Sequence, residues 1–333
     1  MTTDQPSSSS PDPAGNMRNL LSQGRFPEVL AEFRQLQGRN LPPDALLLAA
    51  TAATRLGDFG LGTSSATAAL DRFRSRADDD GRMRSLNLLG VISFERGQLD
   101  QAEQCFTQSL ELARKLDDNL MMARASNNLA SFMYLRNDTM GALTLFRSAL
   151  LSYQRMGDRR GMAESYHNLG IIFREMEAWV DAMDASERAL RHAEQVGEPG
   201  LLGLAATGRA EISVARGELD MAQPELLRAA QLARAAGDSL GIIEVGRVQA
   251  LWYLGRNEYL KAGDEAEKAR AAAEQDRAAV LQAECAAVAA RAWKLLGIPE
   301  KAETRRQEAA QLFQAQGAKR RLEEFERLWQ ILR

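Results

Sequence analysis

Hydrophobic and polar residues along most of the chain recur with the period of amphipathic α-helices. Apolar residues return at spacings of about three to four positions, which places them on one face of a helix. In one representative stretch the first apolar stripe consists of Leu86, Leu89 and Ile92, and the second of Leu99, Phe106 and Leu110. The strict alternation of a half-buried β-strand is not followed there, so the pattern predicts paired helices and an all-α fold.

The paired helices repeat every 40 residues. One series at this interval consists only of alanines: Ala102, Ala142, Ala182, Ala222, Ala262 and Ala302. A second series contains only small residues: Ala50, Gly90, Ala130, Gly170, Ala210, Ala250 and Ala290. Two helices approach closely where one of them offers a small side chain, so both series indicate helix crossings.

A third series predicts the turn inside each helical pair. Its members are Gly57, Gly97, Asn137, Glu177, Gly217, Asn257 and Gly297. Glycine and asparagine tolerate the left-handed backbone with which many helices end. Between pairs, Gly157-Asp158, Gly197-Glu198 and Gly237-Asp238 place a glycine at a helix end and an acid at the next helix start. We therefore expect a solenoid of about eight antiparallel helical hairpins over residues 16–316.

The two ends depart from the repeat. Residues 1–15 are rich in serine and proline, which predicts a disordered tail. A shorter hairpin is expected from Asn16 to Gly38, with its turn at Gly24 and Pro27 in the first turn of its second helix. Residues 317–333 are expected to form a capping helix, with docking onto another chain as the alternative. Pro224 requires either a late helix start or a kink.

Composition and charge narrow the possible functions. The chain has 333 residues, of which 45% are hydrophobic and 6% aromatic, with a formal net charge of −3. Basic residues are dispersed among acidic ones, which argues against a nucleic-acid partner. The basic runs at 159–160 and 319–321 are interpreted as solvated helix ends. Two distant cysteines, Cys105 and Cys285, suggest neither a disulfide framework nor a zinc site, and no segment predicts a membrane span or a signal peptide. We expect a cytoplasmic protein.

The repeat resembles a known family. The motif Leu86-x-x-Leu89-Gly90 followed by Ala102-x-x-x-Phe106 is similar to the tetratricopeptide signature, and Tyr166-x-x-Leu169-Gly170-x-x-Phe173 with Ala182 is closer still. The resemblance covers roughly residues 17–316 and implies a right-handed superhelix of hairpins. The usual unit has about 34 residues. The longer period is similar to that of kinesin light chains, bacterial Rap regulators and the repeat regions of large bacterial transcription activators, which bind or regulate through peptides or proteins.

The candidate binding residues lie on the first helix of each hairpin. Asn128 and Asn168 share one position of the repeat, with Asn127 and His167 beside them. By resemblance to kinesin light chains, these asparagines hold the backbone of an extended peptide; a ladder between repeats is the alternative. Five arginines and five glutamates are also expected on this surface: Arg84, Arg124, Arg174, Arg247 and Arg291, with Glu164, Glu175, Glu211, Glu244 and Glu284. Such a groove has mixed charge.

Together these features predict a scaffold that binds a protein or peptide in its concave groove. The alternative is a sensor whose solenoid binds a peptide or small ligand and controls a separate effector. An enzyme is not expected, and no catalytic residue, cofactor or metal is assigned. The stretch from Gly57 to Ser64 has the glycine spacing of a phosphate-binding loop but lacks its lysine. His167 and His192 show neither metal-ligand nor catalytic-triad spacing.

Overall fold

The computed structural model describes residues 13–36 and 41–332, and within them it contains seventeen α-helices and no strand. The helices in chain order are α1 (Pro13–Ser22), α2 (Phe26–Gln35), α3 (Pro43–Arg55), α4 (Phe59–Ser75), α5 (Asp79–Glu95), α6 (Leu99–Lys115), α7 (Asn119–Leu135), α8 (Thr139–Met156), α9 (Arg159–Glu175), α10 (Trp179–Val196), α11 (Pro199–Ala215), α12 (Leu219–Ala236), α13 (Ser239–Gly255), α14 (Tyr259–Gln275), α15 (Ala279–Leu295), α16 (Pro299–Gln316) and α17 (Lys319–Ile331). The all-α prediction is confirmed.

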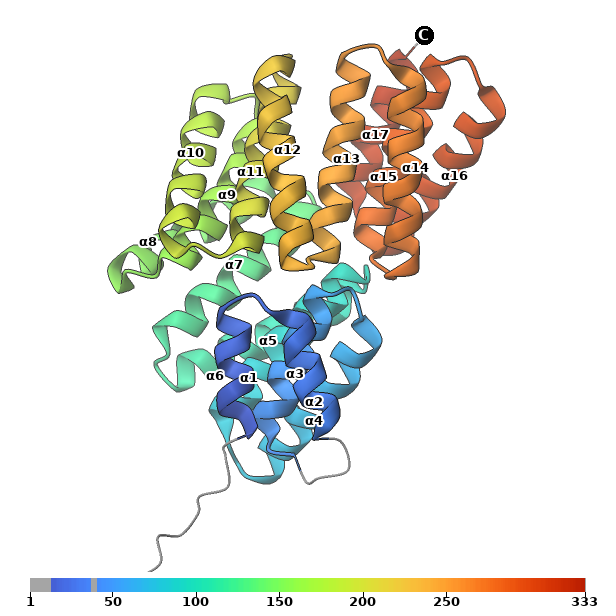
Figure 1. Ribbon diagram of the computed structural model, residues 1–333. Helices are drawn as coiled ribbons and strands as arrows, with labels where there is room; N and C mark the ends of the chain where they lie inside the picture. Colours follow the sequence, from blue (N-terminus) through green and yellow to red (C-terminus); the bar gives the residue numbers. More distant parts are fainter. Residues whose placement is uncertain (1–12, 37–40, 333) are drawn as a thin grey trace, which may run out of the picture.

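The helices pair in chain order as antiparallel hairpins, from α1 with α2 to α15 with α16 (Figure 1). The first helices of successive hairpins also pack on one another, which places them along the inside of the curved stack. We call α3, α5, α7, α9, α11, α13 and α15 the inner helices. Helix α17 follows the eighth hairpin without a second helix of its own.

Small residues at the predicted crossings let these helices approach. Every member of the two 40-residue series is buried, and Ala50, Ala130, Ala210, Ala250 and Ala290 have no exposed surface. A Cβ atom placed on Gly90 would lie 2.5 Å from the ring of Phe106, closer than such atoms pack. The 40-residue register is therefore confirmed, and it is fixed by steric contact.

Left-handed residues separate the helices at the predicted positions. All seven members of the turn series have positive φ, including Glu177 at 57° and Asn137 at 73°. Helix starts are capped in addition, because the side chains of Asp158 and Asp238 accept hydrogen bonds from the backbone N–H groups of Gly161 and Gly241. Glu198 makes no such bond, and Pro199 begins that helix instead.

The start of the first helix differs from expectation. Helix α1 begins at Pro13, three residues before Asn16, because proline suits a first helical turn and Ala14 is buried. Residues 1–12 of the expected tail, and Gly38 of the expected first hairpin, lie outside the described residues.

In the middle of the stack, α12 begins at Leu219 and continues through Pro224, so the predicted late start of this helix is wrong. Pro224 is exposed there.

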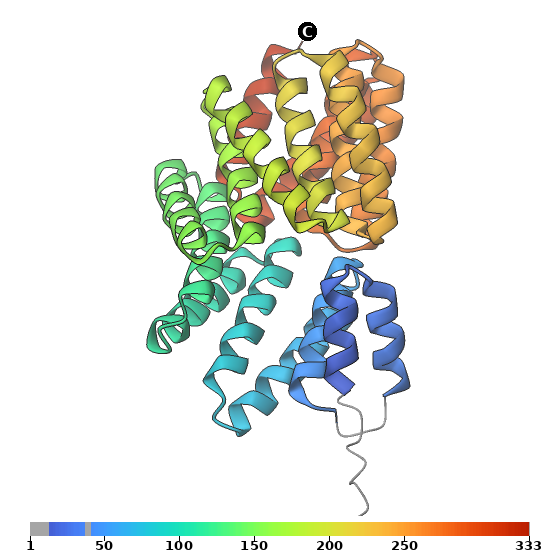
Figure 2. The same cartoon turned by 60° about the vertical axis from the view of Figure 1, so that its left-hand side comes forward.

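The stack curves until its beginning meets its end. Figures 1 and 2 show the first hairpins, in blue, beneath the sixth to eighth, in yellow to orange. One hydrophobic core joins these two layers, since Phe59 and Ile92 belong to the same buried cluster as Ile243 and Cys285. Along this seam the turns of early hairpins face the loops after late ones. A Cβ atom on Gly97 would lie 2.7 Å from the side chain of Gln316.

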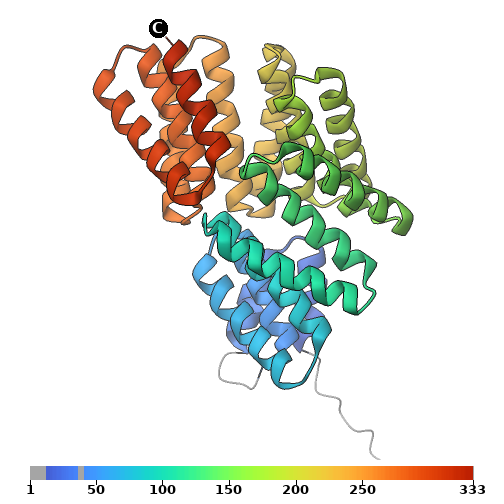
Figure 3. The ribbon, with the colours of Figure 1, turned by 180° about the vertical axis from the view of Figure 1, so that it is seen from behind.

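Helix α17 takes the place of a ninth inner helix. Phe325 packs against Phe313 of α16, with ring centroids 6.2 Å apart, and lies in one cluster with alanines of α15. Seen from behind (Figure 3), α17, in red, lies on the side of the molecule that also carries α7 and α8. The curvature of the stack brings the start of α17 into contact with α7.

We predict that Ala130→Trp destabilises the fold. Ala130 is fully buried at a helix crossing, and overpacking such a site costs about 1–3 kcal/mol or more. The thermal midpoint should fall, whereas Val180→Trp, at a side chain that is 84% exposed, should leave it nearly unchanged. Equal midpoints for the two variants would contradict the assigned register.

A partly buried carboxyl group lies in the seam between the layers. Burial of Glu95, the last residue of α5, raises its pKa to about 7. The positive charge of Arg55 opposes this shift, and the negative charges of three acids in the late hairpins reinforce it: Glu244, Asp238 and Glu284. Glu95 therefore favours the folded state when it carries a proton. This contribution is present below pH 4.5 and is lost as the pH rises through about 7.

We predict that Glu95→Gln removes this pH dependence. Between pH 5 and pH 8 the wild type should lose up to about 3 kcal/mol relative to the variant, which retains a neutral side chain. Thermal or urea unfolding of both proteins at the two pH values measures the difference. Glu111→Gln, on the exposed face of α6, serves as the control and should follow the wild type.

Candidate functional site

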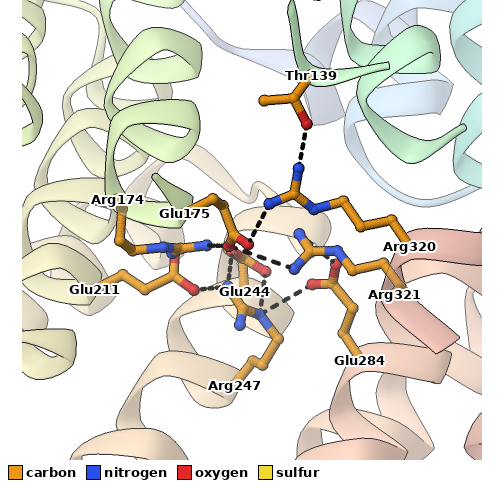
Figure 4. Close-up of polar contacts among 9 residues, drawn as sticks. All are labelled: Thr139, Arg174, Glu175, Glu211, Glu244, Arg247, Glu284, Arg320 and Arg321. Carbon is orange, nitrogen blue, oxygen red and sulfur yellow. Dashed lines mark hydrogen bonds and ion pairs between the residues drawn. The ribbon is translucent and has the colours of Figure 1, made fainter. Parts of the chain in front are cut away.

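Charged side chains from several inner helices meet near the axis of the stack (Figure 4). Arg247 of α13 lies 2.7 Å from Glu211 of α11, 2.6 Å from Glu244 and 3.3 Å from Glu284 of α15. Arg174 of α9 pairs with both Glu211 and its neighbour Glu175. We call these six residues together with Arg320 and Arg321 of α17 the axial network.

The axial network remains charged despite its burial. Burial alone would raise the pKa of Glu211, but Arg174 and Arg247 outweigh it and hold that pKa well below its usual range. Burial likewise opposes the ionised form of Glu175, and Arg321 and Arg174 overcome it. The carboxylates in turn stabilise the charged form of the arginines. The pKa of Arg247 is therefore raised well above its normal value, although burial alone would lower it. Each charge therefore depends on its partners.

The asparagines form a ladder between neighbouring inner helices. Asn128 donates through Nδ2 to Asn87 at 3.0 Å, and Asn168 donates to Oδ1 of Asn127 at 3.5 Å. Ser165 donates to the same Asn127 oxygen at 3.1 Å. Asn127 is buried, whereas Asn128 and Asn168 keep part of their surface exposed. The ladder that the sequence left as an alternative is thus present, beside amide groups that a ligand can still reach.

The remaining predicted groove residues do not all come together. Burial lowers the pKa of His167, whose ring occupies the space left by Gly208, and Glu244 and Glu211 oppose this shift. Arg84 lies apart from the axial network and pairs with Asp44 at 3.2 Å, between α3 and α5. Arg124 is half-buried on α7, where its charge acts on Tyr153. Of the five predicted arginines, Arg174 and Arg247 enter the axial network.

Sequence reasoning misplaced two residues of the network. Arg320 and Arg321 were interpreted as solvated, but their side chains are only 18% and 20% exposed and both pair with Glu175. The repeat carries a signal for Arg321, which shares its register position with Met121, Gly161 and Leu201. All three of these residues are buried. A charged residue at an inward position indicates a buried partner.

A cavity of about 440 Å³ opens beside the network. It lies between the ends of α9 and α11, the start of α10 and one face of α17. Its lining includes Arg174, Glu175, Glu177, Trp179 and Arg320. The cavity thus joins the charged interior to the surface.

The structure also bears on three other kinds of site: a phosphate-binding loop, a metal site and a membrane span. Gly62, Thr63 and Ser64 lie inside α4, so the stretch from Gly57 does not form a phosphate-binding loop. Within residues 13–36 and 41–332, no group of three or more histidine, cysteine, aspartate or glutamate side chains could hold a metal ion. Over the same residues, no helix is both long enough and apolar enough to cross a membrane.

We predict that Arg247→Met destabilises the protein by about 3–5 kcal/mol, because it removes the shared partner of one buried and two partly buried carboxylates. Arg191→Met, at a pair with both side chains more than half exposed, should cost less than about 1 kcal/mol. Urea unfolding of both variants measures the two effects. A loss for Arg247→Met no larger than for Arg191→Met would contradict the role of the network.

Comparison with known proteins places this arrangement in context. The tetratricopeptide repeat family model matches residues 121–195, which span α7 to α10. Over 239 residues the chain is 25% identical to the 43 kDa receptor-associated protein of the synapse of Gallus gallus. That match covers 65% of this chain, which spans 56% of the length of the relative.

Solved structures share the fold over nearly the whole chain. A Rap protein complexed with competence and sporulation factor aligns with a TM-score of 0.62 and 14% identity, over 96% of this chain and 98% of that one. The Rap conjugation gene regulator of plasmid pLS20, in complex with the Phr* peptide, gives 0.67 and 17%, over 94% and 82%. NprR with its cognate peptide NprX gives 0.61 and 14%, over 90% and 87%. These matches show a tetratricopeptide repeat in residues 121–195 and the fold of such solenoids over nearly the whole chain.

Proposed function

We propose that the protein is a scaffold that binds a protein or peptide on the surface of its inner helices, and that it acts by binding and not by catalysis. The observation that carries this proposal is the row of polar side chains that the repeat places along the inner helices. Asn128 and Asn168, the second of which donates to the buried Asn127, supply amide donors and acceptors that suit the backbone of an extended peptide. The axial network lies further along the same surface.

The similar folds support this proposal. The Rap regulator of pLS20 and NprR were both solved with a bound peptide, and each aligns with 90% or more of this chain. Cys285 is a buried free thiol, which fits the reducing cytoplasm in which we propose that the protein works.

A regulatory sensor is the second candidate. The seam joins early and late hairpins through one shared core. A ligand that alters the curvature of the stack would therefore change the contacts between the layers, and with them the surface offered to an effector protein. A ligand that raises the thermal midpoint and at the same time weakens partner binding would favour this candidate.

We predict that Asn128→Ala combined with Asn168→Ala abolishes partner capture without unfolding the protein. Each change removes an amide from a half-buried position and leaves no buried charge unpaired. Affinity capture from lysate of the source cell, read by mass spectrometry, compares this variant with the wild type. Circular dichroism verifies that the variant remains folded.

The matched control is Gln104→Ala combined with Gln108→Ala, two exposed amides on the outer helix α6. Its captured proteins should equal those of the wild type. If the inner and outer variants capture the same proteins, the asparagines serve only as a ladder and the groove assignment is wrong.

A further inference from the structure

Two adjacent arginines at the start of α17 reach into the axial network from the end of the chain (Figure 4). Arg320 lies 3.1 Å from Glu175 of α9 and also donates to the hydroxyl of Thr139, where α8 begins. Arg321 lies 3.3 Å from Glu284 of α15. The pair therefore connects α17 with α8 and α9 on one side and with α15 on the other.

The network requires positive charge that the inner helices themselves lack. Helices α9 to α15 contribute all four of its glutamates, Glu175, Glu211, Glu244 and Glu284, but only two of its arginines, Arg174 and Arg247. The two guanidinium groups of α17 supply the missing charges. Without them, four glutamates would share two arginines, and Glu175 and Glu284 would each keep only one partner, which is costly in a desolvated site.

An aromatic ring completes this site. The guanidinium carbons of Arg320 and Arg321 lie 5.0 and 5.5 Å from the ring centroid of Tyr134, within the range of cation–π attraction. Tyr134 is only 7% exposed, and its hydroxyl has no hydrogen-bond partner. A buried hydroxyl without a partner can still form a hydrogen bond, so it is available to a bound peptide.

The remainder of α17 is anchored to its neighbours, because Arg306 pairs with Glu326 and Lys294 donates to the backbone oxygen of Trp329. Of the residues of α17, Phe325 alone is fully buried, and Ile331 near its end is 68% exposed. The cavity beside Arg320 opens the site toward the surface. A competing segment could therefore enter while α17 keeps its contact with α16.

We propose that Tyr134, Glu175 and Glu284 form a receptor for two adjacent basic residues, that α17 fills this receptor from within, and that a partner segment with two consecutive arginines replaces it. The inference rests on the proposed function, since it assumes that the inner surface binds peptides, and it specifies the chemistry of the partner. The favoured partner is a basic peptide, because only positive charge restores the balance of the network.

The first test uses the full chain with Arg320→Ala and Arg321→Ala, which vacates the receptor. The probe is a labelled peptide that copies residues 317–322, and its matched control carries citrulline, a neutral analogue, in place of both arginines. Fluorescence anisotropy should show at least tenfold tighter binding of the arginine peptide to the vacated variant than to the wild type. Adding Glu175→Gln and Glu284→Gln should abolish this gain, and the citrulline peptide should bind neither protein.

A second measurement uses the wild type and so does not depend on how the variants fold. Excess arginine peptide should increase amide hydrogen exchange at the start of α17, in residues 319–323, and the citrulline peptide should not. Unchanged exchange in α17, or equal binding of the arginine peptide by wild-type and vacated protein, would overturn the proposal. If partner capture still depends on Asn128 and Asn168, that failure leaves the scaffold function intact, so the two hypotheses are separable.

Discussion

The close approach of helices at small residues is the constraint on which the rest of this structure depends. A single alanine or glycine in each unit, at 40-residue intervals from Ala50 to Ala290, decides how near the two helices of a hairpin can lie. The same contact fixes the small rotation from one hairpin to the next. Repeated along the stack, this rotation sets the curvature, and the curvature decides which distant residues meet.

The axial network is a product of that curvature. Arg174 and Arg321 are far apart in the sequence, yet both approach Glu175 because the stack turns back on itself. Buried charges of this kind add little net stability when fully paired, but they are costly when one partner is lost. Such a network favours one arrangement of the inner helices over its neighbours, and it makes that arrangement sensitive to any ligand that brings charge of its own.

Local features of the structure could be predicted from the sequence. The crossings and the turns follow from steric rules that act within one repeat, and even Glu177 adopts the left-handed backbone that its register position predicts. The inward arginine and glutamate positions 174, 175, 211, 247 and 284 could also be found, because each lies at a definite place on an inner helix.

Contacts that depend on the whole superhelix could not be predicted. Arg320 and Arg321 follow a glycine turn in a run of three basic residues, which locally resembles any solvated helix start. The 40-residue register marks Arg321 as an inward position, but its partners Glu175 and Glu284 are set by the summed rotation of eight hairpins, and no short pattern encodes that sum. The seam around Glu95 has the same origin. The candidate binding asparagines could be placed on the correct helices, but their ladder partner Asn87 could not be chosen without the structure.

The seam also has a consequence for how the molecule folds. An open repeat array behaves as a one-dimensional chain, in which end units fray first and stability grows unit by unit. Here the second and third hairpins share a core with the seventh and eighth, so the eighth hairpin cannot melt without exposing its distant neighbours. The late end of the stack is thereby protected, and unfolding becomes a collective event. The same contacts join residues about two hundred positions apart, so this protein gains cooperativity in exchange for slower folding than an open array of equal length.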